Sequence, residues 1–334
     1  LPCFAAEGGV AFRGKLDALY RASARSYCAT RFLMRIAHFR ADNFDYFKRQ
    51  FAAITWELYL PPRCTLSFSI SCRKSRLMHT GRLEQDAREV LASFADEEGS
   101  AQKIFIRFIH DICTVSLDAS GEALYRRSYR THTAEAPLRE TSASLILKHA
   151  GLQNYAALID PMAGSGVFSI EAFMQSKARI PQSLHRFPFF QWPVFSEKMF
   201  NYTLEQGQAK PFDLLIHTSD IDKRCVDIIA QNFNECGLKA EAQCRDFFTL
   251  TNPFPDKKSL IVLNPPYGER IALVDAENFY IKIFEHLRHN FKDCDFALIV
   301  PLKVFSAVER KIIYREKLRF HNGNILTYVL FGGI

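Results

Sequence analysis

The second half of the chain alternates strand-like runs with amphipathic stretches, and this pattern constrains the fold more than any other feature. In 223–237, Val226, Ile229 and Phe233 share one helical face before a stop at Gly237. Strand-like runs lie at 156–159, 212–218, 240–245, 259–263, 296–300 and 323–331, and a further helix is expected after Asp275. Buried strands separated by helices predict a parallel sheet with right-handed crossovers, the arrangement of α/β proteins.

The first half has a different pattern. Residues 65–71 alternate as a half-buried strand, and 81–95 form an amphipathic helix. The runs 103–109 and 112–119 indicate an antiparallel pair. These elements predict an α+β region. The polar, basic segment that follows, which becomes helical after Pro137, is interpreted as a linker.

The charge is unevenly distributed between the halves. The 334 residues carry a formal net charge of +7 and are enough for two domains. Residues 1–150 hold 22 Lys and Arg against 16 Asp and Glu, whereas 151–334 hold 21 against 20. This favours a polyanion-binding region joined to a nearly neutral catalytic one.

Other compositional features exclude some classes of protein. No apolar run reaches the roughly 18 residues of a membrane span. Nine cysteines without a C-x-x-C pair indicate reduced thiols in a cytoplasm, and the histidines show no metal-binding spacing, so we predict no metal. The chain starts without Met or a signal pattern, and we expect its natural beginning to be missing.

The stretch "DPMAGSG" at 160–166 lies where a strand meets a helix. Gly164 and Gly166 let the backbone approach a ligand, and the helix that follows offers free N–H groups. A dinucleotide loop would have a third glycine and an acidic residue about 20 positions on. Here the acidic residue at a strand end is Asp220, 60 positions after Asp160. Asp220 suits ribose hydroxyls and Asp160 suits an ammonium group, so the loop predicts S-adenosylmethionine rather than NAD. A tight turn without a ligand is the alternative.

Asp246 follows the third strand of this pattern. At that position a carboxylate can accept from the adenine amine while Phe247 covers the ring. Taken alone, Asp246 is more simply a turn residue.

The stretch "LIVLNPPYGER" at 260–270 ends an apolar strand on an amide, two prolines and an aromatic ring. The side-chain oxygen of Asn264 and the carbonyl of Pro265 can accept from an exocyclic amine, while both prolines fix φ and remove donors. Tyr267 offers a face on which an extruded base can stack. Adenine, cytosine, guanine and a protein amide all remain open as substrates. Methylation at pyrimidine carbon is disfavoured because the loop has no cysteine, and a plain turn is the alternative.

The ordered stretches "EGGVAF", "ITWELYL", "SCRKSRLMHTG", "YRRSYR", "EAPLRETSASLIL", "DPMAGSGVFSIEA" and "LNPPYGER" resemble bacterial THUMP-domain methyltransferases, of the kind that make N2-methylguanine in 23S ribosomal RNA. The resemblance covers nearly the whole chain from Glu7. It departs from the family where Ala163 replaces Cys, Val167-Phe168 replace Thr-Leu and Ser128 replaces Gly. The usual opening strands are missing, which puts RNA affinity in doubt rather than chemistry.

The resemblance implies an α/β fold with a Rossmann-like class I methyltransferase domain, whose seven-stranded sheet is mostly parallel, preceded by an α+β ferredoxin-like and THUMP region for RNA. The boundaries expected are 1–50 for the ferredoxin-like remainder, 51–120 for THUMP, 121–145 for the linker and 146–334 for the methyltransferase. The catalytic residues are Asn264, Pro265, Pro266 and Tyr267. The cofactor residues are Asp160, Met162, Ala163, Gly164, Ser165, Gly166, Asp220, Ile221, Asp246, Phe247, Asn264 and Thr141.

Two basic clusters are candidates for RNA contact. They are Arg73, Lys74 and Arg76 in a turn, and Arg126, Arg127 and Arg130 in the linker. A solvated turn is an equally good interpretation of either. The insert 178–211 carries Phe187, Phe189, Phe190 and Trp192, which either wall a base pocket or pack in a core.

Together these features predict a cytoplasmic, S-adenosylmethionine-dependent RNA guanine-N2 methyltransferase acting on large-subunit ribosomal RNA. Adenine-N6 methylation of DNA or RNA is the alternative within the same chemistry. A non-catalytic RNA-binding assembly factor is an alternative from another class, and a dinucleotide oxidoreductase is a remote third.

Overall fold

Seven strands of the second half form one mixed sheet in the computed structural model. They are β7 (Ala157–Asp160), β8 (Leu215–Asp220), β9 (Ala242–Cys244), β10 (Ser259–Leu263), β11 (Asp295–Pro301), β12 (Glu316–Asn322) and β13 (Ile325–Gly333). Their order is β12-β13-β11-β10-β7-β8-β9. The pairs from β11 through β9 are parallel, and β13 is antiparallel to both β11 and β12. The prediction of a mostly parallel, Rossmann-like sheet is confirmed; β12 was not among the strands read from the apolar pattern.

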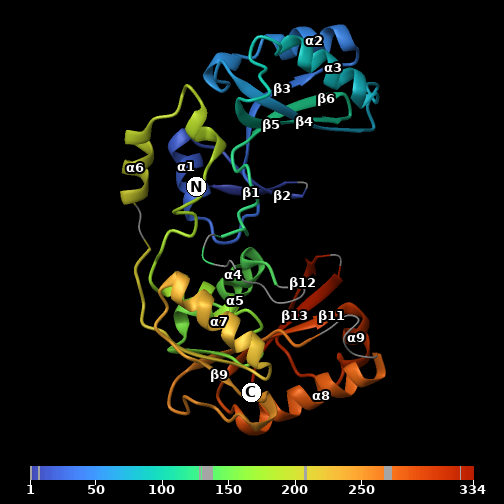
Figure 1. Cartoon of the computed structure of the whole chain (residues 1–334). Helices are drawn as coiled ribbons and strands as arrows, with labels where there is room; N and C mark the ends of the chain where they lie inside the picture. The colour runs from blue at the N-terminus through green and yellow to red at the C-terminus, as the bar shows by residue number, and fades with distance from the viewer. Residues whose placement is uncertain are drawn as a thin grey trace. The chain divides into compact units, whose positions relative to one another are not determined.

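Helices cover both faces of this sheet (Figure 1). They are α4 (Glu140–His149), α5 (Val167–Ser176), α7 (Lys223–Cys236), α8 (Leu273–Asn290) and α9 (Leu302–Val308). Alternate strand residues divide between two cores: Ile261 and Leu263 pack with α8 and α9, whereas Leu260 and Val262 pack with α4 and α5. Helix α7 ends as predicted, because Gly237 adopts a left-handed conformation with φ of +69°.

The structure describes residues 2–6, 8–127, 129, 138–206, 209–266, 273–323 and 325–334, without the side chains of 273–275. It divides into two compact units. The first comprises residues 1–124 and 182–208, and the second comprises 125–181 and 209–334.

The first unit contains a four-stranded sheet in the order β3-β6-β5-β4. The strands are β3 (Leu33–Arg40), β4 (Cys64–Arg73), β5 (Ser100–Ile109) and β6 (Ile112–Asp118). The predicted antiparallel pair is confirmed in β5 and β6, and β4 runs parallel to β5. Helices α2 (Phe44–Ala52) and α3 (Thr80–Val90) bury Phe47, Phe51 and Leu83 against one face of this sheet. The unit also holds β1 (Cys3–Ala6), β2 (Gly9–Phe12), α1 (Leu16–Arg25) and α6 (Glu197–Glu205).

Two features differ from the predicted boundaries. Strand β3 pairs with β6, so a boundary at residue 50 would cut through one sheet. The insert 182–208 belongs with the first unit rather than with the methyltransferase region. Its rings pack in that unit: Phe187, Phe189 and Trp192 are buried, and the ring of Phe189 lies 5.1 Å from that of Tyr20. Core packing therefore accounts for these three aromatic residues.

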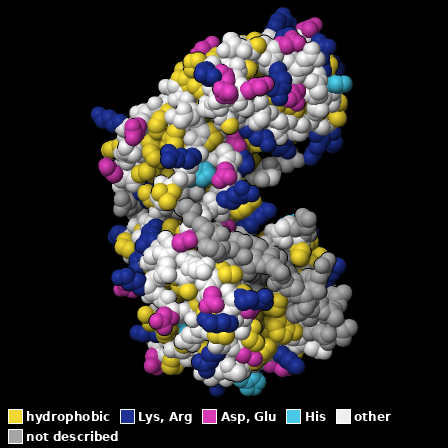
Figure 2. All heavy atoms as spheres, in the orientation of Figure 1, with side chains coloured by type: hydrophobic (Ala, Val, Ile, Leu, Met, Phe, Trp, Pro, Cys, Tyr) yellow, Lys and Arg dark blue, Asp and Glu magenta, His cyan; other side chains and the backbone are white. Residues whose placement is uncertain are grey.

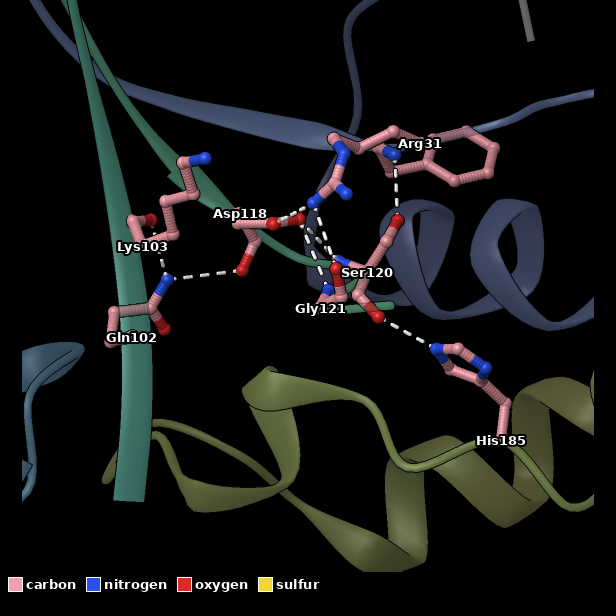
Figure 3. A network of polar contacts seen from close by, with 8 residues as sticks. Arg31, Gln102, Lys103, Asp118, Ser120, Gly121 and His185 are labelled. Atoms are coloured by element: carbon pink, nitrogen blue, oxygen red, sulfur yellow. Dashed lines mark hydrogen bonds and ion pairs between the residues drawn. The ribbon is translucent and has the colours of Figure 1, made fainter. Parts of the chain in front are cut away.

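A polar network joins this insert to the four-stranded sheet (Figure 3). Buried Asp118, at the end of β6, pairs with Arg31 and accepts from the N–H groups of Ser120 and Gly121 at 2.9 and 3.1 Å. The carbonyl of Ser120 lies 2.6 Å from Nε2 of His185 in the insert. Because every contact is local to the first unit, the network fixes where the insert rests within it.

Candidate functional site

The predicted site residues gather at one edge of the seven-stranded sheet. Asp160 ends β7, Asp220 ends β8, and Asn264 directly follows β10. Strands β7, β8 and β10 are parallel, and β7 lies between the other two, so their carboxyl ends meet. The chain leaves β7 toward β8 on one side and later returns as β10 on the other. This is the kind of switch point at which open α/β sheets bind ligands.

The glycine loop turns sharply between β7 and α5. Gly164 and Gly166 have φ of +58° and +80°, values that L side chains rarely adopt. A Cβ on Gly166 would lie 3.3 Å from atoms of Ile229 and Phe233, so this glycine permits close packing on α7. A Cβ on Gly164 would meet no atom within 4 Å among the described residues. Gly166 is thus required by packing, whereas Gly164 borders open space.

Asp220 ties the glycine loop to the end of β8. One carboxylate oxygen accepts from the N–H of Gly164 at 2.8 Å, and the other accepts from the N–H of Asp222 at 2.9 Å. Each oxygen can accept a second hydrogen bond. Ile221, the next residue, is 68% exposed although it is a large apolar side chain. A carboxylate beside an exposed apolar side chain suits a ribose and its attached base.

Asp160 is buried at the base of the loop. Its Oδ2 accepts from the N–H of Ser169 at 3.2 Å and from the hydroxyl of Ser169 at 2.9 Å. Its Oδ1 is buried without a hydrogen-bond partner among the described residues. Burial raises the pKa of the Asp160 carboxyl from 3.8 to about 7; the bonds from Ser169 oppose this rise, and the charge of Asp220 adds to it. Such an oxygen is ready to accept from a positively charged donor.

Asn264, like Asp160, has an unsatisfied hydrogen-bond acceptor among the described residues. Its Oδ1 is buried and has no hydrogen-bond partner in the part of the chain that the structure describes. Pro265 is buried and Pro266 is exposed. Tyr267, predicted to stack on the base, lies outside the described residues. Among the described residues, the end of β10 therefore presents an amide acceptor without a protein donor.

The remaining cofactor candidates fall into two groups. Ala163, Ser165 and Met162 belong to the loop itself, and Thr141 is buried in the first turn of α4. Asp246 accepts from the N–H of Phe248 at 3.0 Å, the turn role that is the simpler interpretation. The structure corrects the prediction that Phe247 covers the adenine ring. Its ring is only 2% exposed and packs 4.8 Å from that of His286 in the core, so it has no free face with which to cover an adenine.

The two basic clusters differ in exposure. Arg73, Lys74 and Arg76 are exposed, and Nη1 of Arg76 lies 3.0 Å from Oδ2 of Asp42. In the second cluster, Arg126 is exposed and Arg130 lies outside the described residues. The prediction for Arg127 is wrong. Its side chain is fully buried, and its Nη1 donates to Oε2 of Glu171 at 2.8 Å, so it cannot reach a phosphate.

Glu171 is a residue that the sequence interpretation missed. This buried carboxylate of α5 accepts from Arg127, Tyr129 and Ser144, and so joins the segment before α4 to both helices. Burial raises the pKa of Glu171, and the charge of Arg127 opposes that rise. The available signal was a single acid within the mostly apolar run 167–174, which predicts a paired buried charge.

Comparisons with known proteins identify the family. Residues 127–325 match the family described as "RMKL-like, methyltransferase domain". The chain belongs to the RMKL-like methyltransferases. It is 30% identical over 344 residues to "Putative RNA methyltransferase slr0064" of Synechocystis sp., an alignment covering 97% of this chain and 89% of that protein. It is 29% identical over 316 residues to "Ribosomal RNA large subunit methyltransferase K/L" of Methylococcus capsulatus, covering 87% of this chain but only 42% of that longer protein.

Solved structures agree on the fold. SMU.472, solved with SAH, has a TM-score of 0.84 at 24% identity and covers 99% of this chain and 91% of its own. TrmN from Thermus thermophilus has a TM-score of 0.66 at 14% identity, with 92% and 84% covered. This RMKL-like methyltransferase therefore has the Rossmann-like methyltransferase fold, and the prediction of S-adenosylmethionine as cofactor is confirmed.

The geometry of the site fits this cofactor. An oxygen of Asp160 without a partner among the described residues, the space that those residues leave open at Gly164, and the exposed apolar side chain of Ile221 lie along the same sheet edge. Among the described residues, no cluster of three or more His, Cys, Asp or Glu side chains could hold a metal ion. No helix in the described ranges is long and apolar enough to span a membrane.

Proposed function

We propose that this RMKL-like methyltransferase methylates the N2 amine of a guanine in large-subunit ribosomal RNA. The observation that carries the proposal is the buried Oδ1 of Asn264 at the switch point, which has no hydrogen-bond partner among the described residues and lies one strand away from Asp160. The names of the two curated relatives, one an RNA methyltransferase and one a ribosomal RNA large subunit methyltransferase, support RNA as the substrate.

The residues at this edge have separable roles. S-adenosylmethionine, when bound, supplies an electrophilic methyl group on a sulfonium. Asp160 accepts from its ammonium group, and Asp220 accepts from its ribose hydroxyls. Asn264 and the carbonyl of Pro265 hold the N–H bonds of the guanine amine, turning its lone pair toward the methyl group. Tyr267 stacks on the extruded base. The amine loses its proton after transfer, so no strong general base is needed.

The first unit supplies the RNA-binding part of this proposal. We assign it the ferredoxin-like and THUMP roles that the sequence resemblance implies. Arg73 and Lys74 are exposed in the predicted basic turn, and in this proposal they contact phosphates. A ribosomal RNA substrate places the reaction in the cytoplasm.

The test is the identity of the methylated nucleoside. Ribosomal RNA lacking the modification is incubated with the chain and S-adenosylmethionine, digested to nucleosides and analysed by mass spectrometry. We expect N2-methylguanosine. N6-methyladenosine as the product would refute the guanine assignment.

Two substitutions assign the roles at the site. Asn264→Ala should abolish methyl transfer, because the amide holds the amine, and leave cofactor affinity within about threefold, because Asp160 and Asp220 still accept from the ammonium group and the ribose. Asp220→Ala should instead weaken cofactor binding by about tenfold or more, because it removes an acceptor for the ribose. Calorimetry measures the affinities, and a wild-type kcat for Asn264→Ala would show that the amide has no role in transfer.

A further inference from the structure

The four-stranded sheet of the first unit has one face that its helices leave open. Along β5, Gln102, Ile104, Ile106 and Phe108 are buried on the side of α2 and α3. The alternate residues point the other way, because successive side chains of a strand lie on opposite faces. We call the face that carries Lys103, Phe105 and Arg107 the open face.

Basic residues recur across the open face. The register places Arg35 of β3 in one row with Ser116, Phe105 and Ser69, and places Arg40 in another with Ile112, Ile109 and Arg73. A third row holds His38, Thr114, Arg107 and Ser71, and Lys103 lies opposite Ser67 in a fourth. Exposed cations therefore occur in every row: Arg35, Arg40, Arg73, Lys103 and Arg107. Figure 2 shows Lys and Arg side chains on the surface of the first unit, together with Asp and Glu side chains.

The charges on the two faces are arranged differently. On the helical side, cations meet carboxylates: Lys48 lies 2.5 Å from Glu89, and Arg88 lies 2.7 Å from Glu84. On the open face, no carboxylate lies within 4.0 Å of Arg35, Arg40 or Lys103 in the part of the chain that the structure describes. Asp118, the one acidic residue of the four strands, is buried and paired with Arg31. The charge of Lys103 also acts on the Asp118 carboxyl, so the cations of the open face whose charge no neighbouring carboxylate balances, among the described residues, are Arg35 and Arg40.

The centre of the open face suits a nucleobase. The ring of Phe105 is half-buried, and Nζ of Lys103 lies 5.3 Å from its centroid. Its cross-strand neighbours, Ser69 and Ser116, are small hydroxyl residues. A ring among short side chains can be approached by a flat base, and an aromatic ring on a sheet is a stacking platform that RNA-binding proteins use.

We propose that the open face binds single-stranded RNA, with phosphates on Arg35, Arg40 and Lys103 and a base stacked on Phe105. This deepens the proposed function, because it assumes an RNA substrate and says how the first unit holds it. A single strand is favoured over a duplex because stacked, paired bases cannot reach Phe105. The basic turn that follows Arg73 continues the same surface, since Arg73 lies in the row of Arg40.

The experiment measures RNA binding by the full chain without cofactor, so that it does not depend on which base is methylated. A fluorescent single-stranded RNA is titrated with the wild type and with the triple variant Arg35→Gln/Arg40→Gln/Lys103→Gln over a range of salt concentrations. Each phosphate contact contributes about 0.7 to the slope of log K against log salt on single strands. Loss of three contacts should lower that slope by about 2 and the affinity at 0.1 M salt by roughly 100-fold.

A matched control removes three exposed cations from the helical side, in the variant Arg49→Gln/Arg82→Gln/Arg88→Gln. The control variant and the triple variant lose the same net charge. If the position of the cations determines RNA binding, the control should retain RNA affinity within about threefold of the wild type. Phe105→Leu should weaken single-stranded RNA by about tenfold and leave a duplex unaffected. Melting temperatures within about 3 °C of wild type show that the variants are folded.

Two results would overturn the proposal. One is a triple variant whose affinity and salt slope equal those of the wild type or of the control. The other is equal binding of poly-L-glutamate through the same three residues, which would make the face a site for acidic proteins. Failure to find N2-methylguanosine would refute the proposed function but would leave the binding result unchanged.

Discussion

Asp160→Asn should make the protein without cofactor more stable at alkaline pH while weakening cofactor binding. The carboxyl is buried, one of its oxygens has no partner among the described residues, and its pKa is raised to about 7. A group whose pKa is higher in the folded state favours folding below its unfolded pKa of 3.8, and this contribution is lost as pH rises through 7. Asparagine stays neutral at every pH and keeps an acceptor for Ser169.

The magnitude follows from the pKa difference. With a pKa of 3.8 unfolded and about 7 folded, the loss of stability relative to a neutral group is about 2 kcal/mol at pH 5 and about 4 kcal/mol at pH 8. Asparagine avoids this loss, but burying its amide N–H group costs about 1–3 kcal/mol, which offsets part of the stability gained by the substitution. That offset does not depend on pH. The advantage of Asp160→Asn in the free energy of unfolding should therefore grow by about 2–3 kcal/mol between pH 5 and pH 8.

Urea denaturation of both proteins, followed by circular dichroism at several pH values, measures this difference. Calorimetry at pH 8 should show that S-adenosylmethionine binds the variant at least tenfold more weakly, because a charged acceptor for its ammonium group has been lost. A stability difference that stays constant within about 0.5 kcal/mol from pH 5 to pH 8 would refute the raised pKa. Equal affinity of the two proteins for S-adenosylmethionine would refute the role of Asp160 as acceptor for the ammonium group.

Four further substitutions, one of them with a matched control, test how the site and its supports are built. Gly166→Ala should lower the free energy of unfolding by about 1–3 kcal/mol, because its Cβ would press on Ile229 and Phe233 at positive φ. Gly164→Ala should lower it by about 1–2 kcal/mol and should mainly weaken the binding of the cofactor. Thermal melting measures the change in stability, and calorimetry measures the change in cofactor affinity. Arg127→Met should cost about 3–5 kcal/mol by leaving Glu171 without its cation, whereas exposed Arg288→Met on α8 should stay within about 1 kcal/mol in the same urea denaturation. Trp192→Phe should cost about 1–2 kcal/mol in thermal melting, because Gln102 loses the indole N–H that donates to it at 2.8 Å.

The sheet of the second unit was predictable because its signals are local. Runs such as 260–263 and 296–300 are apolar along their whole length, as is typical of buried parallel strands, and the apolar face of α7 and its stop at Gly237 lie within the 15 residues 223–237. The glycine loop and the end of β10 were found for the same reason, since each motif lies within a few residues of a strand end. Strand β12 was not identified, because its alternation of charged and apolar residues does not form an apolar run.

The errors arose where a distant partner decides a residue's role. In the sequence, Arg127 resembles a surface cation because other arginines lie near it. In the structure its side chain is buried and pairs with Glu171, 44 residues further along the chain. Phe247 follows a candidate ligand residue, yet its ring packs on His286 and Phe291 of the α8 region. Neither partner lies within the motif, so sequence spacing alone gives both residues an exposed role.

The predicted methyltransferase boundary at residue 146 likewise ignores packing partners that are distant in the sequence, in this case for a whole domain. A fragment from 146 to 334 would contain 182–208 but not the residues that this insert packs against. The rings of Phe187, Phe189 and Trp192 would lose their burial, which is worth about 1.5–3 kcal/mol for a large apolar side chain. Tyr20, in α1, would in turn lose Phe189 at 5.1 Å and Phe195 at 5.5 Å in a fragment that ends at residue 145. The first unit can therefore complete its core only after residue 208 has been synthesised, and no single cut in the sequence separates the two units.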